Sequence, residues 1–239
     1  MYKIGFQTCK HIHLSFLDQF RYAEQNNVPH FDIFFDDFLP SRFSDNEISF
    51  IKEMIKKNIS FSIHSPIDNY AYYHEFLDGV IDFTNEINAF SITFHFDKIS
   101  FKTIEAILKR LNKNIKLSIE NTIPDYSYLY SKNYLEFIKE LNSHFKDIYL
   151  TFDAGHCFVN KYNPYDYLKY LIDSNIKIST FHFHNNNGDE DSHHYLKNGK
   201  IDFKGIASLI KNLNYDFVII IEHWHYNLDS YNYLLEILK

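Results

Sequence analysis

The sequence predicts a single (β/α)8 TIM barrel with its site at the C-terminal mouth of the strands, and two observations lead to this prediction. Eight short segments rich in β-branched and aromatic residues alternate with segments of helical periodicity, at about 30 residues per pair. Alternating strand and helix units imply a parallel sheet, and eight units in 239 residues match the size of a closed barrel. A doubly wound open sheet is the competing architecture, but no Gly-x-Gly-x-x-Gly turn follows any predicted strand. We therefore assign residues 1–239 to one domain.

The predicted strands are apolar stretches that stop at a turn signal or at an ionisable residue. They are Lys3–Cys9, Phe31–Phe35, Ser60–His64, Ser91–Phe96, Lys116–Glu120, Ile148–Asp153, Ile176–His184 and Phe217–Glu222. The third strand is closed by Ser65 and Pro66, because the residue before a proline resists helical geometry.

The predicted helices carry apolar residues at helical spacing and lie between the strands. They are Leu14–Asn26, Asp45–Lys57, Tyr72–Asn88, Phe101–Leu111, Lys132–Leu141, Pro164–Asp173, Phe203–Leu213 and Ser230–Leu238. In the second helix we expect Asp45 to be the N-cap, with Glu47 in the first turn.

Composition is that of a globular protein, with 45% hydrophobic and 23% charged residues. The two cysteines, Cys9 and Cys157, have no paired spacing, which favours a reducing cytoplasm over a disulfide scaffold. No signal pattern opens the chain, and no apolar run approaches the ~18 residues of a membrane span. A net charge of −7 argues against a protein that binds nucleic acid over a broad surface, although a local phosphate site stays compatible with it.

Six successive predicted strands, from the third to the eighth, end in ionisable residues flanked by large apolar ones. These residues are His64, His95, Glu120, Asp153, His182 with His184, and Glu222. In a barrel the carboxyl ends of all strands meet at one mouth. A single histidine there is more often a hydrogen-bonded structural residue, whereas buried carboxylates are costly unless they are paired or bind a cation.

The stretch around the seventh strand carries a second ligand pattern. His182 and His184 share one strand face, and the loop that follows presents Asp191 and His193, two residues apart. These groups suit a first-row metal such as zinc, although a polar strand end with a solvated acidic loop gives the same pattern. Upstream, a short turn separates Asp153 from His156, so that both can face one cation.

Counting back two residues from the strand ends finds small hydroxyl side chains. They are Ser62, Thr93, Ser118, Thr151 and Thr180. We expect them just below the mouth, either orienting ligands by hydrogen bonds or filling a narrow interior. Among the other histidines, we expect His30 at the surface and His223 at the rim, without a role.

In this order the motifs resemble the xylose isomerase-like TIM barrels, a family of sugar and sugar-phosphate isomerases and epimerases that also includes endonuclease IV. The matching motifs are His64-Ser65-Pro66, His95, Ile119-Glu120-Asn121-Thr122, Asp153-Ala154-Gly155-His156, His182-Phe183-His184-Asn185-Asn186, Asp191-Ser192-His193, Gly199-Lys200-Ile201-Asp202-Phe203 and Glu222.

The isomerase and epimerase branch implies one divalent ion, often manganese. The resemblance assigns its ligands to Glu120, Asp153, His182 and Glu222. Glu120 and Glu222 would also move the proton at the carbon next to the substrate carbonyl, while the ion stabilises the enediolate. The expected substrate contacts are His64, His95, His156, His184 and Lys197. Lys197 stands where the family has a glycine, and it offers a cation for a substrate phosphate.

The endonuclease branch implies three zinc ions. The matching ligands are His64, His95 and Glu120 for the first, Glu120, Asp153, His182 and Glu222 for the second, and His156, Asp191 and His193 for the third. All nine residue types are present, and such a cluster would suit phosphodiester hydrolysis. Against this branch, the first strand lacks the Gly-x-His-x-Ser-x-x-Gly-Gly pattern, the chain is short and its net charge is negative.

The leading hypothesis is a metal-dependent isomerase or epimerase of a small sugar, sugar phosphate or cyclitol, with one Mn2+ or Zn2+ ion. The alternative is an endonuclease IV-like phosphodiesterase with up to three Zn2+ ions that acts on abasic-site DNA. A third class is a non-catalytic barrel that binds a metal or a ligand. We expect a small carbohydrate partner, with nucleic acid less favoured, no membrane partner, and a homo-oligomer by analogy with the family.

Overall fold

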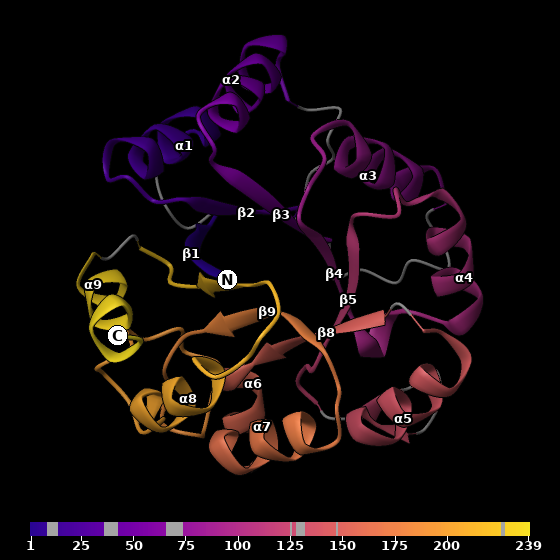
Figure 1. Cartoon of the computed structure of the whole chain (residues 1–239), viewed down its shortest axis with the longest axis vertical. Helices are drawn as coiled ribbons and strands as arrows, with labels where there is room; N and C mark the ends of the chain where they lie inside the picture. Colours follow the sequence, from indigo (N-terminus) through magenta and orange to yellow (C-terminus); the bar gives the residue numbers. More distant parts are fainter. Residues whose placement is uncertain are drawn as a thin grey trace.

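In the computed structural model the predicted strands close into a barrel that is ringed by helices (Figure 1). The structure describes residues 1–8, 14–35, 43–65, 74–124, 126–127, 132–146, 148–225 and 228–239, so Cys9 and Pro66 lie outside the described residues. Strand neighbours follow the order β1-β10-β9-β8-β5-β4-β3-β2, and each of these pairs is parallel. The predicted barrel is therefore confirmed. Among the described residues, no helix has the length and apolar character that a bilayer span requires.

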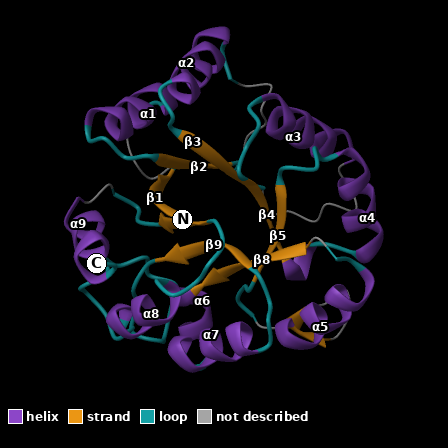
Figure 2. Cartoon of the chain, viewed as in Figure 1, coloured by secondary structure: helices purple, strands orange, loops and turns teal. Residues whose placement is uncertain are grey.

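The barrel strands are β1 (Tyr2–Gln7), β2 (His30–Phe34), β3 (Ser60–His64), β4 (Ser91–His95), β5 (Lys116–Glu120), β8 (Ile148–Asp153), β9 (Ile178–Phe183) and β10 (Phe217–Ile221). The helices are α1 (Phe16–Gln25), α2 (Asp45–Lys56), α3 (His74–Glu86), α4 (Phe101–Arg110), α5 (Tyr134–His144), α6 (Ala154–Val159), α7 (Pro164–Asp173), α8 (Phe203–Ile210) and α9 (Leu228–Ile237). Figure 2 shows the helices outside the strands. The structure adds α6, a 3-10 helix (Phe96–Lys98) and a hairpin of β6 (Tyr126–Ser127) and β7 (Lys132–Asn133), none of which was predicted.

Helix α2 shows how local chemistry sets a boundary. Its N-cap is Ser44, so the prediction of Asp45 was wrong. The Ser44 hydroxyl accepts a hydrogen bond from the Glu47 backbone N–H, and the Glu47 carboxylate accepts one from the Ser44 backbone N–H at 2.8 Å. This reciprocal capping box requires a Glu three residues after the cap, a spacing that Ser44 satisfies and Asp45 does not.

The layer between the barrel and its helices is largely aromatic. Phe31 of β2 and Phe61 of β3 meet Phe20 of α1 edge to face, with ring centroids 5.3 and 5.9 Å apart. All three rings are buried. Alternate strand residues face this layer, which leaves the other positions of each strand pointing into the barrel.

Small hydroxyls occupy the barrel interior below the mouth and hydrogen-bond to one another. Thr93 Oγ1 lies 2.8 Å from Thr151 Oγ1, and the Thr151 hydroxyl donates to Ser118 Oγ at 2.7 Å. Ser91 Oγ lies 3.1 Å from Thr180 Oγ1. These bonds favour the interpretation that the hydroxyls fill the interior over the one in which they orient ligands.

The expectation that His30 lies at the surface was wrong. Its ring is fully buried at the start of β2, with Nδ1 2.7 Å from Ser60 Oγ and Nε2 2.9 Å from Ser62 Oγ. The Ser62 hydroxyl donates in turn to Asp32. Because strand residues alternate, His30 and Asp32 both take inward positions of β2, and the barrel contains a polar chain beneath its mouth.

Burial, with a smaller contribution from Lys3, lowers the pKa of His30 from 6.5 to about 3. The unfolded chain gains this proton near pH 6.5, whereas the folded protein resists it down to about pH 3, so the free energy of unfolding falls as the pH falls through this window. We expect His30→Gln to remove this pH-dependent loss of stability. The difference in unfolding free energy between the wild type and the variant should then change by roughly 1.4 kcal/mol per pH unit.

Denaturant unfolding of both proteins in chelator, at several pH values between about 6 and 4, measures this difference. His144→Gln, at an exposed histidine of α5, is the matched control. Parallel pH profiles for wild type and His30→Gln would contradict the prediction.

Candidate metal centre

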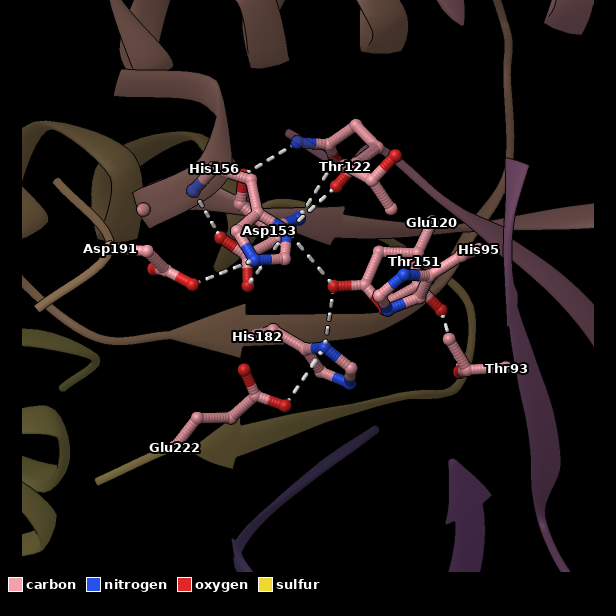
Figure 3. A network of polar contacts seen from close by, with 12 residues as sticks. Thr93, His95, Glu120, Thr122, Thr151, Asp153, His156, His182, Asp191 and Glu222 are labelled. Atoms are coloured by element: carbon pink, nitrogen blue, oxygen red, sulfur yellow. Dashed lines mark hydrogen bonds and ion pairs between the residues drawn. The ribbon is translucent and has the colours of Figure 1, made fainter. Parts of the chain in front are cut away.

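The mouth of the barrel gathers imidazole and carboxylate groups from the ends of six neighbouring strands. Figure 3 shows the side chains of His95, Glu120, Asp153, His182 and Glu222 turned toward one another there. His64, His95, Glu120 and Asp153 end strands β3, β4, β5 and β8, His182 lies on β9, and Glu222 follows β10. His95 pairs with Glu120 and Asp153 with His182 in the strand register, so the side chains lie side by side. His95 is partly buried and the other five are buried.

Glu120 is the hub of this group. Its carboxylate lies 3.0 Å from His64 Nε2 and 3.1 Å from His182 Nδ1, with His156 Nδ1 at 3.4 Å and His95 Nε2 at 3.6 Å. Burial alone would raise the pKa of Glu120, but the charge of His182 and hydrogen bonds from His156, His182 and His64 hold it well below its ordinary value. Burial lowers the pKa of His95 to about 3, so this imidazole is neutral, the form that binds metals.

Glu222 contacts the same ring nitrogen of His182 as Glu120 does. Its Oε1 lies 3.0 Å from His182 Nδ1 and accepts a hydrogen bond from Gln7 Nε2, which also donates to Asp32 Oδ2 at 3.3 Å. Burial and the repulsion of Asp153 and Glu120 raise the pKa of Glu222 well above its ordinary value. The two glutamates that contact one imidazole therefore differ in their affinity for a proton.

A second set of ligand groups adjoins the first through Asp153. The Asp153 carboxylate accepts a hydrogen bond from the His156 backbone N–H at 2.6 Å and caps α6, which fixes where the His156 ring points. His184 Nε2 lies 3.3 Å from Asp153 Oδ1 and 3.4 Å from Asp191 Oδ1. Asp191 Oδ2 lies 3.4 Å from His156 Nε2 and 3.2 Å from His193 Nε2.

The proton affinities in this second set follow from burial and from the two carboxylates. Burial alone would lower the pKa of His156, but Asp153 and Asp191 raise it well above its ordinary value. In the same way, the Asp191 carboxylate raises the pKa of His193 against its burial. Burial and the neighbouring His193 lower the pKa of His184.

The loop that follows β9 carries Asp191 and His193 back over the mouth. A backbone bridge joins Asn185 to His194, and the Asn185 side-chain amide donates to Leu196 O at 2.7 Å. His193 has a φ of 45°, the left-handed region that few residues without glycine's freedom adopt, and its Nδ1 lies 2.8 Å from Glu222 O. Backbone strain of this kind is held in place by its surroundings and is concentrated at functional sites.

Glycine is required at position 155 because the ring of His184 lies directly against it. A Cβ atom there would lie 1.9 Å from Cε1 of His184, so any side chain would displace that ring. Gly155 thereby allows α6 to approach the end of β9 and brings His156 to Asp191.

These residues fit a divalent metal ion. Groups of three side chains whose ligand atoms lie within 4.8 Å of one another are His64, Glu120 and His182; Asp153, His182 and Glu222; Asp153, His156 and His184; and His184, His193 and Glu222. Among the described residues, several buried ligand atoms have no hydrogen-bond partner: Asp153 Oδ2, His182 Nε2 and both ring nitrogens of His184. Buried polar atoms are normally satisfied, and imidazole with carboxylate is a donor set for zinc or manganese.

The structure brings together all nine residues that the endonuclease branch implies, and it places His184 among them. His184, which the strand pattern offered as a metal ligand and the family resemblance as a substrate contact, belongs to two of the groups. The ammonium of Lys197 lies 5.1 Å from the ring centroid of Tyr233 on α9. His223, expected at the rim, is buried and its Nε2 lies 3.0 Å from Ser230 Oγ.

Sequence reasoning missed Gln7 and Asp32, which connect Glu222 to the barrel interior. Gln7 lies two residues before Cys9, the end of the predicted first strand, so the count that found the small hydroxyls would have found it too. The same count from Phe35, the end of the predicted second strand, gives Ile33 and misses Asp32. The count started only from strands that end in a histidine or a carboxylate, and neither of these two strands does.

A closed parallel barrel with histidines and carboxylates gathered at its C-terminal mouth defines a TIM barrel with a candidate metal centre. The model of the xylose isomerase-like TIM barrel family matches residues 20–239, and the chain belongs to this family. In sequence it is similar to the uncharacterized protein MJ1614 of Methanocaldococcus jannaschii, at 27% identity over 205 residues, which are 76% of this chain and 77% of the relative. A second protein of that organism, MJ1311, is 31% identical over 128 residues, 52% of this chain and 42% of the relative.

Solved structures with the same fold carry different activities. A D-tagatose 3-epimerase-like protein superposes with a TM-score of 0.79 at 21% identity, and the match covers 99% of this chain and 97% of the chain of that protein. Endonuclease IV from Thermus thermophilus superposes with a TM-score of 0.70 at 16% identity, with the same two coverages. At these identities the likeness establishes the fold alone.

Proposed function

We propose that the protein is a divalent-metal-dependent epimerase or isomerase of an uncharged sugar or cyclitol, which moves a proton at the carbon next to a carbonyl. The observation that carries this proposal is the pair of buried carboxylates, Glu120 and Glu222, placed on either side of His182 Nδ1 at 3.1 and 3.0 Å. Proton transfer of this kind needs one group that removes a proton and one that returns it.

The residues divide the work as follows. Glu120, Asp153, His182 and Glu222 would hold the ion, which when bound would polarise a substrate carbonyl. One of the two glutamates takes the proton from the substrate carbon, and the other delivers a proton to the opposite face. Gln7 holds the Glu222 carboxylate by a hydrogen bond to Oε1, so that its orientation does not depend on the substrate.

The charges at the mouth support an uncharged substrate. Among the described residues, the ion-pair contacts that the centre makes are all between histidines and carboxylates, with no lysine or arginine. Lys197, the residue expected to receive a phosphate, lies against Tyr233 instead. In the described part of the mouth, a phosphate at the centre would therefore meet carboxylates and imidazoles, with no lysine or arginine paired to them.

A second candidate is an endonuclease IV-like phosphodiesterase, which one specific observation favours. Asp191 and His193 reach the centre on a strained loop and join His156, so that groups for more than one ion adjoin each other. Neighbouring ions can hold the attacking and leaving oxygens of a phosphodiester. For a one-ion epimerase, the same residues would instead contact substrate hydroxyls.

The number of ions per chain separates the two functions. We expect elemental analysis of protein that is stripped with chelator and reconstituted to give close to one ion, with epimerisation of a sugar panel that depends on it. Three zinc ions per chain, with incision of abasic-site DNA that is lost in His193→Ala, would overturn the epimerase proposal in favour of the hydrolase. The matched control is His194→Ala, because His194 is adjacent and exposed.

A further inference from the structure

The only tryptophan of the chain lies beside the candidate metal centre. Trp224 comes two residues after Glu222 and is 45% exposed. Its ring is nearly parallel to that of His193, at 24° with centroids 5.6 Å apart, and His193 in turn stacks on His184 at 15° and 3.9 Å. Three aromatic rings thus lead from the buried centre to the surface.

A cavity of about 540 Å³ adjoins these rings. Asp191 and His193 belong both to its wall and to the candidate metal centre, so the cavity is continuous with the site. The rest of the wall includes Trp224, Tyr195 and Asn198. A volume of this size is typical of small-molecule sites. The cavity itself lies outside the group of ligand atoms that would bind the reacting end of a substrate.

The wall chemistry suits a sugar ring. Trp224 and Tyr195, exposed by 45% and 37%, offer aromatic faces to the C–H surface of a ring. The amide of Asn198 and the hydroxyl of Ser192 offer hydrogen bonds to ring hydroxyls. The described lining holds two carboxylates, Glu190 and Asp191, three histidines and no lysine or arginine, so no permanently charged cation faces the carboxylates to receive a phosphate here.

We propose that this cavity is a subsite for a second, uncharged sugar ring, and that the substrate is a glycoside or disaccharide rather than a free monosaccharide. The inference rests on the proposed carbohydrate function and narrows its substrate class. The reacting ring lies between Glu120 and Glu222, and the second ring lies against Trp224. Because a single residue separates Glu222 from Trp224 in the chain, the two sugar rings lie next to each other.

Tryptophan emission tests the proposal, because Trp224 alone produces it. We titrate the protein, in chelator and again with Mn2+, with maltose, cellobiose, D-glucose and AMP. We expect at least one disaccharide to change the emission, with a half-saturation concentration roughly tenfold below that of glucose. Tyr195→Ala should raise this concentration about 3- to 10-fold, whereas Tyr170→Ala, at an exposed tyrosine of α7, should leave it unchanged. Equal responses to glucose and disaccharides, a response to AMP alone, or no response to any sugar would overturn the proposal.

Steady-state kinetics separate this inference from the proposed function. In Trp224→Ala we expect the ratio of KM for a glycoside to KM for a monosaccharide to rise about tenfold relative to the wild type. If disaccharides alone change the tryptophan emission but no sugar is turned over, the subsite proposal is retained and the epimerase proposal is rejected. Turnover of monosaccharides and glycosides with equal KM in wild type and Trp224→Ala would retain the epimerase and reject the subsite.

Discussion

Glu120→Gln is expected to lower turnover of the proposed epimerase by about 10²- to 10⁴-fold, the range that removal of a general acid or base produces. The substitution preserves the size of the side chain but removes the charge that His64, His95, His156 and His182 all face within 3.6 Å. The amide can neither take a proton from the substrate nor bind an ion as a carboxylate does.

Two measurements separate these two losses. Exchange of the substrate proton with solvent deuterium reports on proton transfer, and elemental analysis reports on the ion. Asp97→Asn is the matched control, because Asp97 is a buried carboxylate near the mouth that accepts a hydrogen bond from Thr122 Oγ1 at 3.1 Å and lies outside the nine residues. Full turnover in Glu120→Gln, or an equal loss in Asp97→Asn, would contradict the role of Glu120.

The barrel and most of its mouth could be predicted because both follow from strand periodicity. A parallel barrel puts every strand end at one rim, so the pattern that identified β5 and β8 also brought Glu120 and Asp153 together. Register then fixes which ends are neighbours, as for Asp153 and His182. No tertiary information was needed beyond the order of the elements.

The loop after β9 is different, because its path depends on contacts that no periodicity encodes. The bridge from Asn185 to His194 and the left-handed backbone at His193 turn Asp191 toward the centre. The local pattern offered Asp191 and His193 as ligands, and the resemblance to the family grouped them with His156, but neither predicted this path of the loop. For Lys197 the sequence predicted a cation but not where its side chain points. In the structure its ammonium lies near the ring of Tyr233.

The buried carboxylates place function and stability in opposition. Burial and the repulsion of Asp153 and Glu120 raise the pKa of Glu222, so its ionised carboxylate is retained at a cost to the folded state, whereas the neighbouring histidines hold the pKa of Glu120 below its ordinary value. An ion bound among the carboxylates would offset this cost, since a ligand that binds only the folded state stabilises it. The metal-free protein should therefore become more stable when the charge of Glu222 is removed.

Glu222→Gln should both stabilise the metal-free protein and impair turnover. The pKa of Glu222 in the folded state is raised above the ordinary value of 4.5. The free energy of unfolding of the wild type therefore falls as the pH rises from 4.5 toward this raised pKa, and the variant lacks this fall. In chelator at pH near 8 we expect a higher melting temperature for the variant, by about 2–4 °C for each ~1 kcal/mol recovered. With Mn2+ or Zn2+ added, the variant should gain less than the wild type, and turnover should fall by about 10²- to 10⁴-fold. A metal-free variant that melts below the wild type at every pH would show instead that the Glu222 carboxylate stabilises the fold, through Gln7 and His182, even without an ion.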